Sequence, residues 1–473
     1  MHFHLIGVCG TGMGALAGLL REAGHRVTGS DRAFEPPMGD ALVRWGIELK
    51  QGYSPAHLAP APDYVVIGNV CRPDNPEARA AIEQGLPYGS LPQTVHDHFL
   101  VQTRPFVVAG THGKTTTTSM LAFVLDRCGL SPGFLIGGLP RDFPHSFRTA
   151  PPNAPFVIEG DEYDSAFFEK TPKFWRYAAQ VAVINAIEHD HVDIYPDLAA
   201  YRQAFVRFIA GMPSDGLLFG YAADAEVRTL CRQAPCTVRW FATAGEDTAD
   251  VAPDYLALPQ PDGSFAVRCA AGEIGPFHAP LTGTHNLRNA LVAAAMAHEG
   301  AGVALQEALG HLAAFGGVRR RQELRGTVAG VRVYDDFAHH PTAVAETLKG
   351  IRARHPDGRV IAVYEPRSAT AARAMHQTSY PAAFAAADLT LLAPVGRKEL
   401  AVAERLDVDE VAADIRAAGG QAEACVDVAQ IIERLVQVCA AGDSVVVMSN
   451  GAFEGIHERL LAELALHQRS GGA

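Results

Sequence analysis

Short apolar runs alternate with amphipathic segments along the whole chain, and this alternation restricts the possible folds more than any other feature of the sequence. The expected strands are His4–Val8, Arg26–Gly29, Tyr64–Ile67, Phe106–Ala109, Phe156–Glu159, Val181–Asn185, Val331–Tyr334, Val360–Tyr364 and Ser444–Met448. The expected helices include Met13–Ala23, Lys114–Arg127, Asn286–His298 and Thr342–Arg354. Strands that alternate with helices favour an α/β fold with parallel, doubly wound sheets.

The expected elements fall into three α/β blocks within the 473 residues. A domain typically takes about 150 residues, so the length also favours three domains. We place them at residues 1–100, 101–317 and 318–473, with Rossmann-like sheets in the first and the last. The stretch Leu218–Pro280 has little helical periodicity and many short β-like pieces with Pro, Gly and Asp. This predicts an antiparallel subregion of the middle domain.

The composition disfavours several kinds of partner. Lys and Arg total 40 against 52 Asp and Glu, a net charge of −12, so we expect neither a nucleic-acid partner nor binding to an anionic membrane. The eight cysteines are scattered, which favours reduced thiols. No apolar run approaches the ~18 residues of a membrane span. The segment from Met1 to Leu20 reads as strand, turn and helix and not as a signal peptide, so we expect a cytoplasmic protein.

The segment Ala109–Thr116 reads Ala-Gly-Thr-His-Gly-Lys-Thr-Thr and directly follows an expected strand. Glycines let main-chain N–H groups converge on phosphate oxygens, and the helix that begins here adds the positive end of its dipole. Lys114, one of only six lysines in the chain, would reach the outer phosphates, and Thr115 would offer its hydroxyl to Mg²⁺. The glycine spacing is unusual because Val108 stands where the first glycine is expected. The context still predicts a phosphate-binding loop.

A second glycine-rich loop, Gly7–Gly14, follows the first strand, and Asp31 ends the next one. The arrangement resembles a dinucleotide-binding loop, but Cys9 stands where the second glycine is expected. A nicotinamide-dependent dehydrogenase is therefore disfavoured. The diphosphate of a sugar nucleotide fits this loop as well as a dinucleotide does. The alternative is that these glycines only permit close packing of the strand against the helix and bind no ligand.

Two acidic clusters follow strands of the middle block. Glu159–Asp164 has four carboxylates in six residues, and their repulsion favours a compensating cation, although a solvated acidic loop is the alternative. Glu188–Asp193 alternates His and Asp, which alone suits a zinc site, a polar loop or a catalytic role. Beside a phosphate loop, Mg²⁺ at the first cluster and a second cation held by His191 become the favoured interpretation.

Three further polar groups lie near expected element ends. Asn286 and Asn289 stand about one helical turn apart and could bind adenine, although taken alone helix capping by Asn286 is the favoured explanation. The triplet Arg319–Arg321 suits an anion, although a solvated face explains it as well. Asp336, after a strand, suits a ribose hydroxyl or an ordered water molecule.

In this order the motifs resemble those of the Mur ligase family, ATP-dependent enzymes that form amide bonds in bacterial cell-wall synthesis. The resemblance covers essentially the whole chain. The matching segments are Gly7–Gly14, Gly110–Thr116, Asp161–Glu162, Asp190–Asp193, His285–Ala290, Arg320–Arg321 and Asp335–Pro341. It implies a nucleotide-sugar domain at 1–100, an ATP-binding domain at 101–317 and an acceptor-binding domain at 318–473.

The resemblance also implies the residues of each site. ATP contacts fall on Gly110, Thr111, His112, Gly113, Lys114, Thr115, Thr116, His285, Asn286, Asn289, Arg320 and Asp336. UDP-sugar contacts fall on Gly7, Cys9, Gly10, Thr11, Gly12, Met13, Ser30, Asp31 and Asn69. Two Mg²⁺ ions fall on Thr115, Glu162 and His191, and the acceptor peptide on Arg367, Ser368, Ser449 and Asn450. Catalytic roles fall on Lys114, His191, Arg320 and His339, the last to orient or deprotonate the amine.

The chain departs from the family pattern at two points. Several members use a carbamoylated lysine beside the second cation, but no lysine occurs here between Lys173 and Lys349. An asparagine usually found two residues before Glu188 is replaced by Ala186, with Asn185 next to it.

Two branches of the family are similar to this chain and share UDP-N-acetylmuramate as a substrate. One adds L-alanine, and the other adds the recycled tripeptide L-alanyl-γ-D-glutamyl-meso-diaminopimelate. Glu365–Ser368 and Ser449–His457 resemble the second branch, so we expect tripeptide ligation, with L-alanine addition as the alternative. A folate polyglutamate ligase shares the phosphate loop, but the Gly7–Gly14 loop argues against it. A non-catalytic nucleotide sensor is disfavoured because each expected ATP-handling position holds a competent residue.

Overall fold

The computed structural model describes residues 1–35, 38–397 and 399–471. The chain forms two compact units. The first comprises Met1–Glu188, Asp197–Ala279 and Arg288–Gly316. The second comprises His189–Pro196, Pro280–Leu287 and Gly317–Ala473. Among the described residues, no helix is both long and apolar enough to span a membrane.

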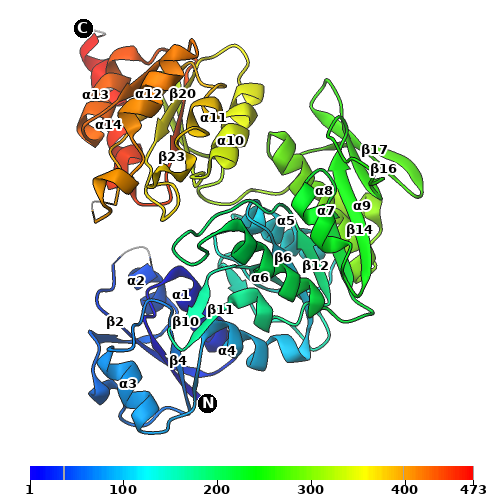
Figure 1. Ribbon diagram of the computed structural model, residues 1–473. Helices are drawn as coiled ribbons and strands as arrows, with labels where there is room; N and C mark the ends of the chain where they lie inside the picture. Colours follow the sequence, from blue (N-terminus) through cyan, green and yellow to red (C-terminus); the bar gives the residue numbers. More distant parts are fainter. Residues whose placement is uncertain (36–37, 398, 472–473) are drawn as a thin grey trace. The chain divides into compact units, whose positions relative to one another are not determined.

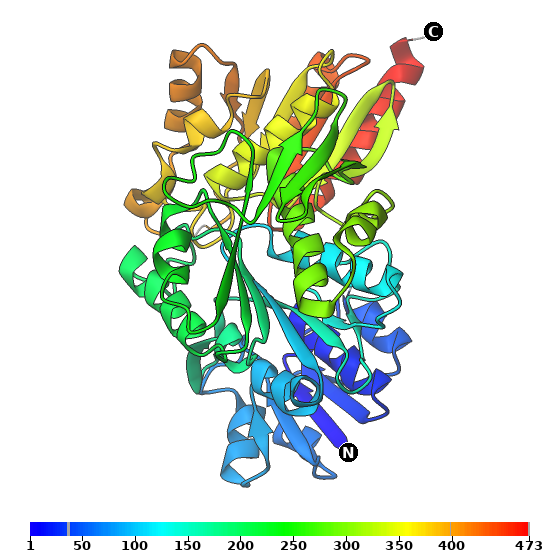
Figure 2. The ribbon, with the colours of Figure 1, turned by 90° about the vertical axis from the view of Figure 1, so that its right-hand side faces the viewer.

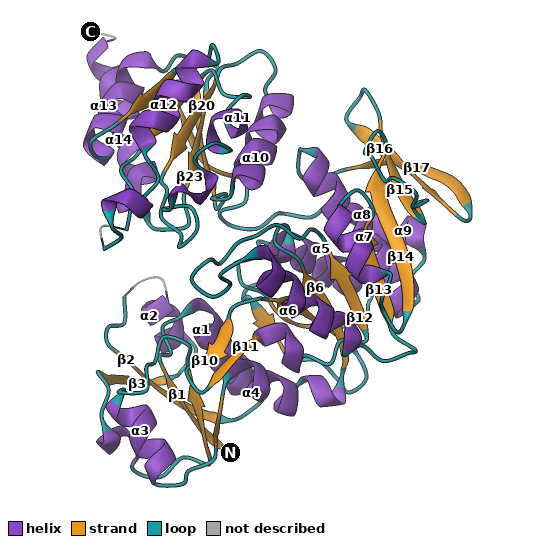
Figure 3. Ribbon diagram, in the orientation of Figure 1, coloured by secondary structure: helices purple, strands orange, loops and turns teal. Residues whose placement is uncertain are grey.

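The first unit begins with a five-stranded parallel sheet (Figures 1 and 3). Its order is β3 (Glu48–Gln51), β2 (Arg26–Asp31), β1 (His2–Ile6), β4 (Tyr64–Ile67) and β5 (Tyr88–Gly89). Its helices are α1 (Thr11–Glu22), α2 (Met38–Arg44), α3 (Pro76–Glu83) and α4 (Leu91–His98). The first strand ends two residues earlier than predicted, because Gly7 takes a positive φ of 82° and turns the chain toward α1.

The same unit contains a ten-stranded sheet. Its order is β17 (Gly272–His278), β16 (Ser264–Cys269), β15 (Tyr255–Pro259), β14 (Thr237–Thr243), β13 (Leu217–Tyr221), β12 (Val181–Ile184), β6 (Arg104–Ala109), β9 (Pro155–Gly160), β7 (Gly133–Leu135) and β8 (Phe147–Arg148). A separate hairpin joins β10 (Asp164–Ala166) and β11 (Glu169–Pro172). The helices are α5 (Lys114–Arg127), α6 (Leu198–Ala210), α7 (Ala225–Cys231), α8 (Thr284–Ala301) and α9 (Leu305–Leu312).

The predicted antiparallel subregion Leu218–Pro280 is only partly correct. Strands β13, β14 and β15 run parallel to one another and to β12, and α7 lies within the same stretch. Only β16 and β17 are antiparallel. The short apolar runs before residue 255 indicated strands but gave no signal of their direction, because α7 was not recognised as the crossover between β13 and β14.

The second unit is built on a six-stranded sheet with helices on both faces. Its order is β18 (Glu323–Val328), β19 (Val331–Asp336), β23 (Ser444–Met448), β20 (Val360–Tyr364), β21 (Leu389–Leu392) and β22 (Ala422–Ala424), with only β18 antiparallel. The helices are α10 (Pro341–Arg354), α11 (Tyr380–Ala383), α12 (Val408–Ala417), α13 (Val428–Val438) and α14 (Ile456–Gly471).

Alternation along the central strands explains this double coverage. Val360, Ala362 and Tyr364 pack with α10, α11 and α12, whereas Ile361 and Val363 pack with α13 and α14. Successive side chains of a strand point to opposite faces, so an entirely apolar strand requires helices on both sides. Figure 2 shows α14, in red, beside strands β18 and β19, which it contacts.

Candidate active site

The loop between β6 and α5 lies at the carboxyl edge of the ten-stranded sheet. Strand β6 pairs on one side with β9 and on the other with β12, so the segments that follow these three strands meet. Gly110 and Gly113 take positive φ values of 112° and 77°. A Cβ atom on Gly113 would lie 2.6 Å from the Asn289 side-chain oxygen, so only glycine fits this loop.

The phosphate-loop lysine is bound to the acidic cluster. Lys114 Nζ donates to both carboxylate oxygens of Glu162 at 2.9 Å and to the Gly110 carbonyl oxygen at 2.8 Å. Burial alone would lower the pKa of Lys114, but the charges of Glu162 and Asp161 raise it above its ordinary value. Tyr201 donates its hydroxyl to the same Glu162 carboxylate at 3.1 Å. Lys114 is therefore held charged at this edge of the sheet.

Thr115 was expected to share a cation with Glu162, but its hydroxyl contacts a different carboxylate, that of Glu159. Its hydroxyl donates to Glu159 Oε2 at 3.0 Å, while the Gly137 N–H donates to Oε1 at 2.5 Å. Burial raises the pKa of Glu159 to about 7, and the charge of Asp161 adds to the rise. Glu159 belongs to the recognised acidic run, but its place at the end of β9 hid its proximity to Thr115.

The remaining phosphate-loop side chains are anchored by the segment after β12. His112 Nε2 lies 2.9 Å from Glu188 Oε2, and Thr111 donates its hydroxyl to the Glu188 carbonyl oxygen. Asn185 donates its side-chain N–H to His112 O and to Thr117 Oγ1, both at 3.2 Å. Asn185 thus anchors the phosphate loop. The sequence did not predict this role, because the asparagine of the family pattern is expected at the next position, where this chain has Ala186. Thr116 is buried within α5.

The three residues expected at adenine lie on α8 but not in one compact unit. Asn289 belongs to the first unit and faces Gly113. Asn286 belongs to the second unit, where its amide donates to the Thr282 carbonyl oxygen at 2.8 Å. His285 Nδ1 lies 3.5 Å from a carboxylate oxygen of Glu346 in the same unit. In this contact Asn286 donates to a carbonyl oxygen, whereas an N-cap side chain accepts a main-chain N–H, so capping by Asn286 stays a prediction.

Two predicted histidines of the second unit meet around one carboxylate. His339 Nε2 lies 3.7 Å from Asp190 Oδ2, and His191 Nε2 lies 3.9 Å from the same oxygen. Thr370 donates its hydroxyl to Asp190 Oδ1 at 2.5 Å and accepts the His191 N–H at 3.0 Å. Burial would raise the pKa of Asp190, but its contacts with His339, His191 and Thr370 hold that pKa well below its usual range. The sequence did not identify Thr370.

Arg320 and the expected acceptor residues are gathered at the carboxyl ends of β20 and β23. Arg320 Nη2 donates to the carbonyl oxygens of Ser449 and Gly451 at 2.6 and 2.7 Å. Ser449 donates its hydroxyl to Glu365 Oε2 at 2.5 Å, and Arg367 donates to Glu365 Oε1 at 3.4 Å. Glu365 contacts both Ser449 and Arg367, and the sequence did not predict this role.

Of the other residues in this group, Ser368 and Asp336 have local hydrogen-bond partners, whereas the buried side-chain oxygen of Asn450 has none among the described residues. Asn450 lies between Ser449 and Gly451, and Ser368 accepts the Ala371 N–H at 3.0 Å. Asp336 is buried and accepts the N–H groups of Gln322 and Ala338 at 2.7 and 2.8 Å. Burial raises the pKa of Asp336. The expected contact of Asp336 with a ribose hydroxyl stays a prediction.

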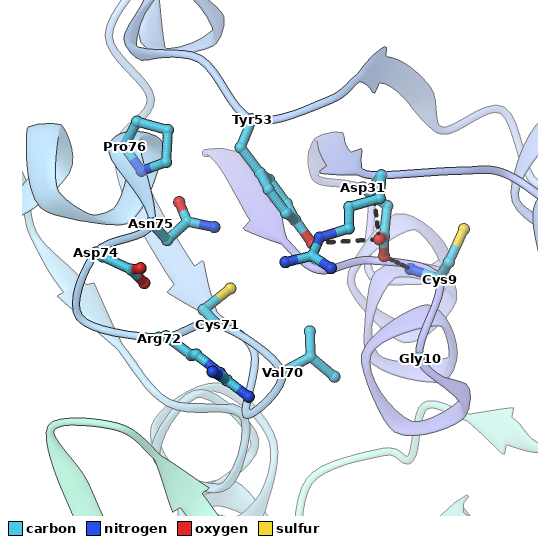
Figure 4. Close-up of a pocket in the computed structure, with 11 residues that line it drawn as sticks. Cys9, Gly10, Asp31, Tyr53, Val70, Cys71, Arg72, Asp74, Asn75 and Pro76 are labelled. Carbon is cyan, nitrogen blue, oxygen red and sulfur yellow. Dashed lines mark hydrogen bonds between the residues drawn. The ribbon is translucent and has the colours of Figure 1, made fainter. Parts of the chain in front are cut away.

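A cavity of about 720 Å³ opens beside the first glycine-rich loop (Figure 4). Asp31 accepts the N–H groups of Cys9 and Arg32 at 2.8 and 2.7 Å and the Tyr53 hydroxyl at 3.2 Å. Burial, followed by the charge of Asp31, raises the pKa of the Cys9 thiol to about 11. The lining residues are Cys9, Gly10, Asp31, Arg32, Tyr53, Val70, Cys71, Arg72, Asp74, Asn75 and Pro76.

Only part of the predicted nucleotide-sugar set lines this cavity. Cys9, Gly10 and Asp31 do, whereas the Ser30 side chain is buried in β2 and Asn69 is exposed and not among the lining residues. Gly7, Thr11, Gly12 and Met13 form the turn and the first part of α1. The sequence missed Tyr53 and the two arginines Arg32 and Arg72, which could have been found only by knowing that the loops after β2, β3 and β4 meet.

Comparison with known proteins identifies the family. The family models described as the Mur ligase family catalytic domain, the Mur ligase middle domain and the Mur ligase glutamate ligase domain match residues 2–101, 108–297 and 320–451. The chain belongs to the Mur ligase family. Members of this family are ATP-dependent ligases, and the chain is an enzyme of this class.

Particular relatives fall in both expected branches. The UDP-N-acetylmuramate–L-alanyl-γ-D-glutamyl-meso-2,6-diaminoheptandioate ligase of Escherichia coli (strain K12) is 38% identical, over 98% of each chain. The UDP-N-acetylmuramate–L-alanine ligase of Rubrobacter xylanophilus is 34% identical, over 98% of this chain and 100% of its own length.

Solved structures give the same picture of the fold. The murein peptide ligase of Psychrobacter arcticus 273-4 superposes with a TM-score of 0.72 at 38% identity, covering 98% of this chain and 99% of its own. A UDP-N-acetylmuramate–alanine ligase of Thermotoga maritima shares the fold with a TM-score of 0.76 at 22% identity, covering 99% of this chain and 100% of its own. The predicted three-domain α/β architecture is confirmed.

Proposed function

We propose that the protein joins the carboxylate of UDP-N-acetylmuramate to the amino group of L-alanyl-γ-D-glutamyl-meso-diaminopimelate, with conversion of ATP to ADP and phosphate. The observation that carries this proposal is the 38% identity, along nearly the full length, to the Escherichia coli ligase named for these two substrates. The L-alanine ligase compared above is 34% identical over a similar length. The segments around Glu365 and Ser449 also favour the tripeptide branch.

ATP binding is proposed at the loop Gly110–Thr116. The converging main-chain N–H groups, the positive end of α5 and the charged Lys114 suit the phosphates. Magnesium fits the donor set, because Glu159, Asp161 and Glu162 form a concentration of carboxylate oxygens beside the Thr115 hydroxyl. Burial and then the charge of Asp161 raise the pKa of Glu159, and a hard cation would offset the repulsion between these carboxylates.

Two cations are proposed, one near Thr115 and Glu162 and one near Glu162 and His191. To this set the Thr115 contact adds Glu159. Bound magnesium would neutralise phosphate charge while an anionic carboxylate approaches.

The reaction is proposed to run through an acyl phosphate. The muramate carboxylate attacks the γ-phosphorus, the bond to the bridging oxygen of ADP breaks, and ADP leaves. Lys114 stabilises the negative charge on the transferred phosphoryl group. The peptide amine then attacks the acyl carbonyl, phosphate leaves with the bonding electrons, and the amine loses one proton.

His339 is proposed to orient the amine or to accept its proton. Its position beside Asp190 supports this role, because contact with the carboxylate fixes the orientation of the imidazole ring. Arg320 is proposed to bind phosphate or the acceptor, since it lies between the loop at Ser449 and Gly451 and the carboxylate of Asp335.

We assign the substrates to the domains 1–100, 101–317 and 318–473 as UDP-sugar, ATP and acceptor peptide respectively. The cavity beside Asp31 supports the first assignment, because Arg32 and Arg72 suit a diphosphate and Tyr53 suits a base. A nucleotide-activated substrate and ATP place the proposed reaction in the cytoplasm, in the recycling of peptidoglycan fragments.

An acceptor assay tests the proposal. Purified protein is given UDP-N-acetylmuramate, ATP and Mg²⁺ with either the tripeptide or L-alanine, and amide products are quantified by mass spectrometry. We expect efficient ATP-dependent ligation of the tripeptide and little of L-alanine. The reverse preference would contradict the tripeptide proposal and establish L-alanine addition in its place.

A further inference from the structure

Helices α5 and α9 of the first unit pack against each other at their far ends from the phosphate loop. Helix α5 ends at its C-cap residue, Cys128, and α9 carries Glu307 and His311. The Cys128 sulfur, a Glu307 carboxylate oxygen and a His311 ring nitrogen all lie within 4.8 Å of one another. Three different metal-ligating groups therefore converge from two separate elements.

The two helices hold these groups in place through their buried faces. On α9, Leu305, Ala308 and Leu312 are buried, so Glu307 and His311 lie on the other face, one helical turn apart. Near the end of α5, Phe123 packs against Phe315, which follows α9, with ring centroids 5.6 Å apart. The ligating atoms consequently need little rearrangement to meet around one ion.

A bound cation would change the charge state of this cluster. Burial raises the pKa of the Cys128 thiol, and the negative charge of Glu307 raises it further. A thiolate and a carboxylate at this separation would repel, whereas a divalent cation between them would attract both. The Glu307 and His311 side chains are 4.0 Å apart, close enough to share such an ion after a small rotamer adjustment.

We propose that Cys128, Glu307 and His311 bind one divalent transition-metal ion of the zinc type. Thiolate, imidazole and carboxylate together suit Zn²⁺ and Co²⁺, with water in the fourth position, whereas Mg²⁺ prefers oxygen ligands alone. Binding releases the thiol proton as the sulfur–metal bond forms. Helix α5 has 14 residues, so at about 1.5 Å per residue this site lies on the order of 20 Å along the helix from Lys114.

An ion bound at this site would link the C-terminal end of α5 to α9. An ion bound only by the folded arrangement stabilises the folded protein by mass action. None of these three side chains belongs to the proposed ligase site, so we expect ligation to proceed without the ion.

Cobalt titration provides the direct test, carried out on the whole protein with excess Mg²⁺ to occupy the oxygen-rich sites. We expect one equivalent of Co²⁺ to produce a thiolate-to-metal charge-transfer band in the near ultraviolet. The substitution Cys128→Ser should abolish the band, and the control Cys236→Ser should retain it. Glu307→Gln and His311→Ala should each weaken binding at least about tenfold. A band that survives Cys128→Ser, or no saturable binding near one equivalent, would overturn the proposal.

Thermal unfolding supplies a second readout that does not depend on the charge-transfer band. Zn²⁺ should raise the melting temperature of the unaltered protein and leave that of Cys128→Ser unchanged, while both proteins ligate at equal rates without added zinc. Equal stabilisation of both proteins by Zn²⁺ would place the ion elsewhere and refute this site.

Discussion

Lys114 is tied by its ammonium group to Glu162 and to the Gly110 carbonyl oxygen, so a bound polyphosphate has to replace or share those contacts. The neighbouring carboxylates keep the lysine charged despite its burial. This arrangement is suited to bringing two anions together, because the positive charge is fixed in position before the substrates arrive.

The substitution Lys114→Ala is expected to reduce phosphate release by about 10²–10³-fold, the scale of losing one charge-stabilising donor. Binding of UDP-N-acetylmuramate, measured by calorimetry, should be unchanged because its proposed cavity lies beside Asp31. The matched control is Lys170→Ala, which removes an exposed lysine paired with Asp164. Simultaneous loss of phosphate release and of UDP-sugar binding would contradict this division of labour.

Cys9 lines the cavity at the first glycine-rich loop, so its alkylation tests whether UDP-N-acetylmuramate binds there. Because its pKa is raised to about 11, the thiol is protonated at neutral pH, and near pH 8 only about one in a thousand is ionised. Alkylation at Cys9 should therefore be slow and should accelerate about tenfold per pH unit as the pH approaches 11.

Saturating UDP-N-acetylmuramate is expected to block alkylation of Cys9, as mapped by peptide mass spectrometry. The buried Cys231, far along the chain in α7, serves as the internal control and should react equally slowly with and without the ligand. Unaltered labelling of Cys9 at saturating ligand would remove it from the binding site.

At the scale of elements, the buried carboxylate of Glu77 connects helix α3 to strand β1 and to the loop at Ser54. Glu77, at the start of α3, is fully buried, with Oε1 2.5 Å from His4 Nε2 in β1. Its other oxygen accepts the Ser54 N–H at 3.1 Å. Tyr53 and Asn75, which line the cavity, adjoin these anchored residues. The walls of the cavity thus depend on a hydrogen-bond network beneath them.

Removing this carboxylate by Glu77→Ala is expected to lower the free energy of unfolding by about 3–5 kcal/mol, because a buried partner is left unpaired. Denaturant unfolding followed by circular dichroism measures the change. Glu83→Ala on the same helix removes an exposed ion pair with Arg79 and should have little effect. Comparable losses in both variants would show that the buried network has no special weight.

Local patterns predicted most of the elements, because glycine loops and apolar runs are properties of short segments. Helix α5 begins at Lys114 and ends at Arg127 as predicted, and β20 spans Val360–Tyr364 as predicted. Contacts between distant segments were not predictable in the same way. Glu365 joins Ser449 across 84 positions of sequence, and Glu77 joins His4 across 73. Such pairs depend on strand order, which periodicity does not encode.

At the scale of the whole molecule, the proposed ATP residues are divided between the two compact units. Gly110–Thr116 and Asn289 belong to the first, and Arg320 and Asp336 to the second. A protein that ends at Gly316 would keep the phosphate loop and the cavity beside Asp31, but it would lack Arg320 and the cluster around Glu365.

This shortened protein is expected to bind UDP-N-acetylmuramate and to form no amide, as measured by calorimetry and by product mass spectrometry. Circular dichroism and retained UDP-sugar binding control for its folding. Full ligase activity of this shortened protein would contradict the assignment of acceptor binding to residues 318–473.

The acyl phosphate is tested most directly by isotope transfer. UDP-N-acetylmuramate carrying oxygen-18 in its carboxylate is ligated to the tripeptide, and the released phosphate is analysed by mass spectrometry. Attack of the carboxylate on the γ-phosphorus predicts one labelled oxygen in each phosphate released. Phosphate that contains no label while the amide accumulates would contradict the proposed mechanism.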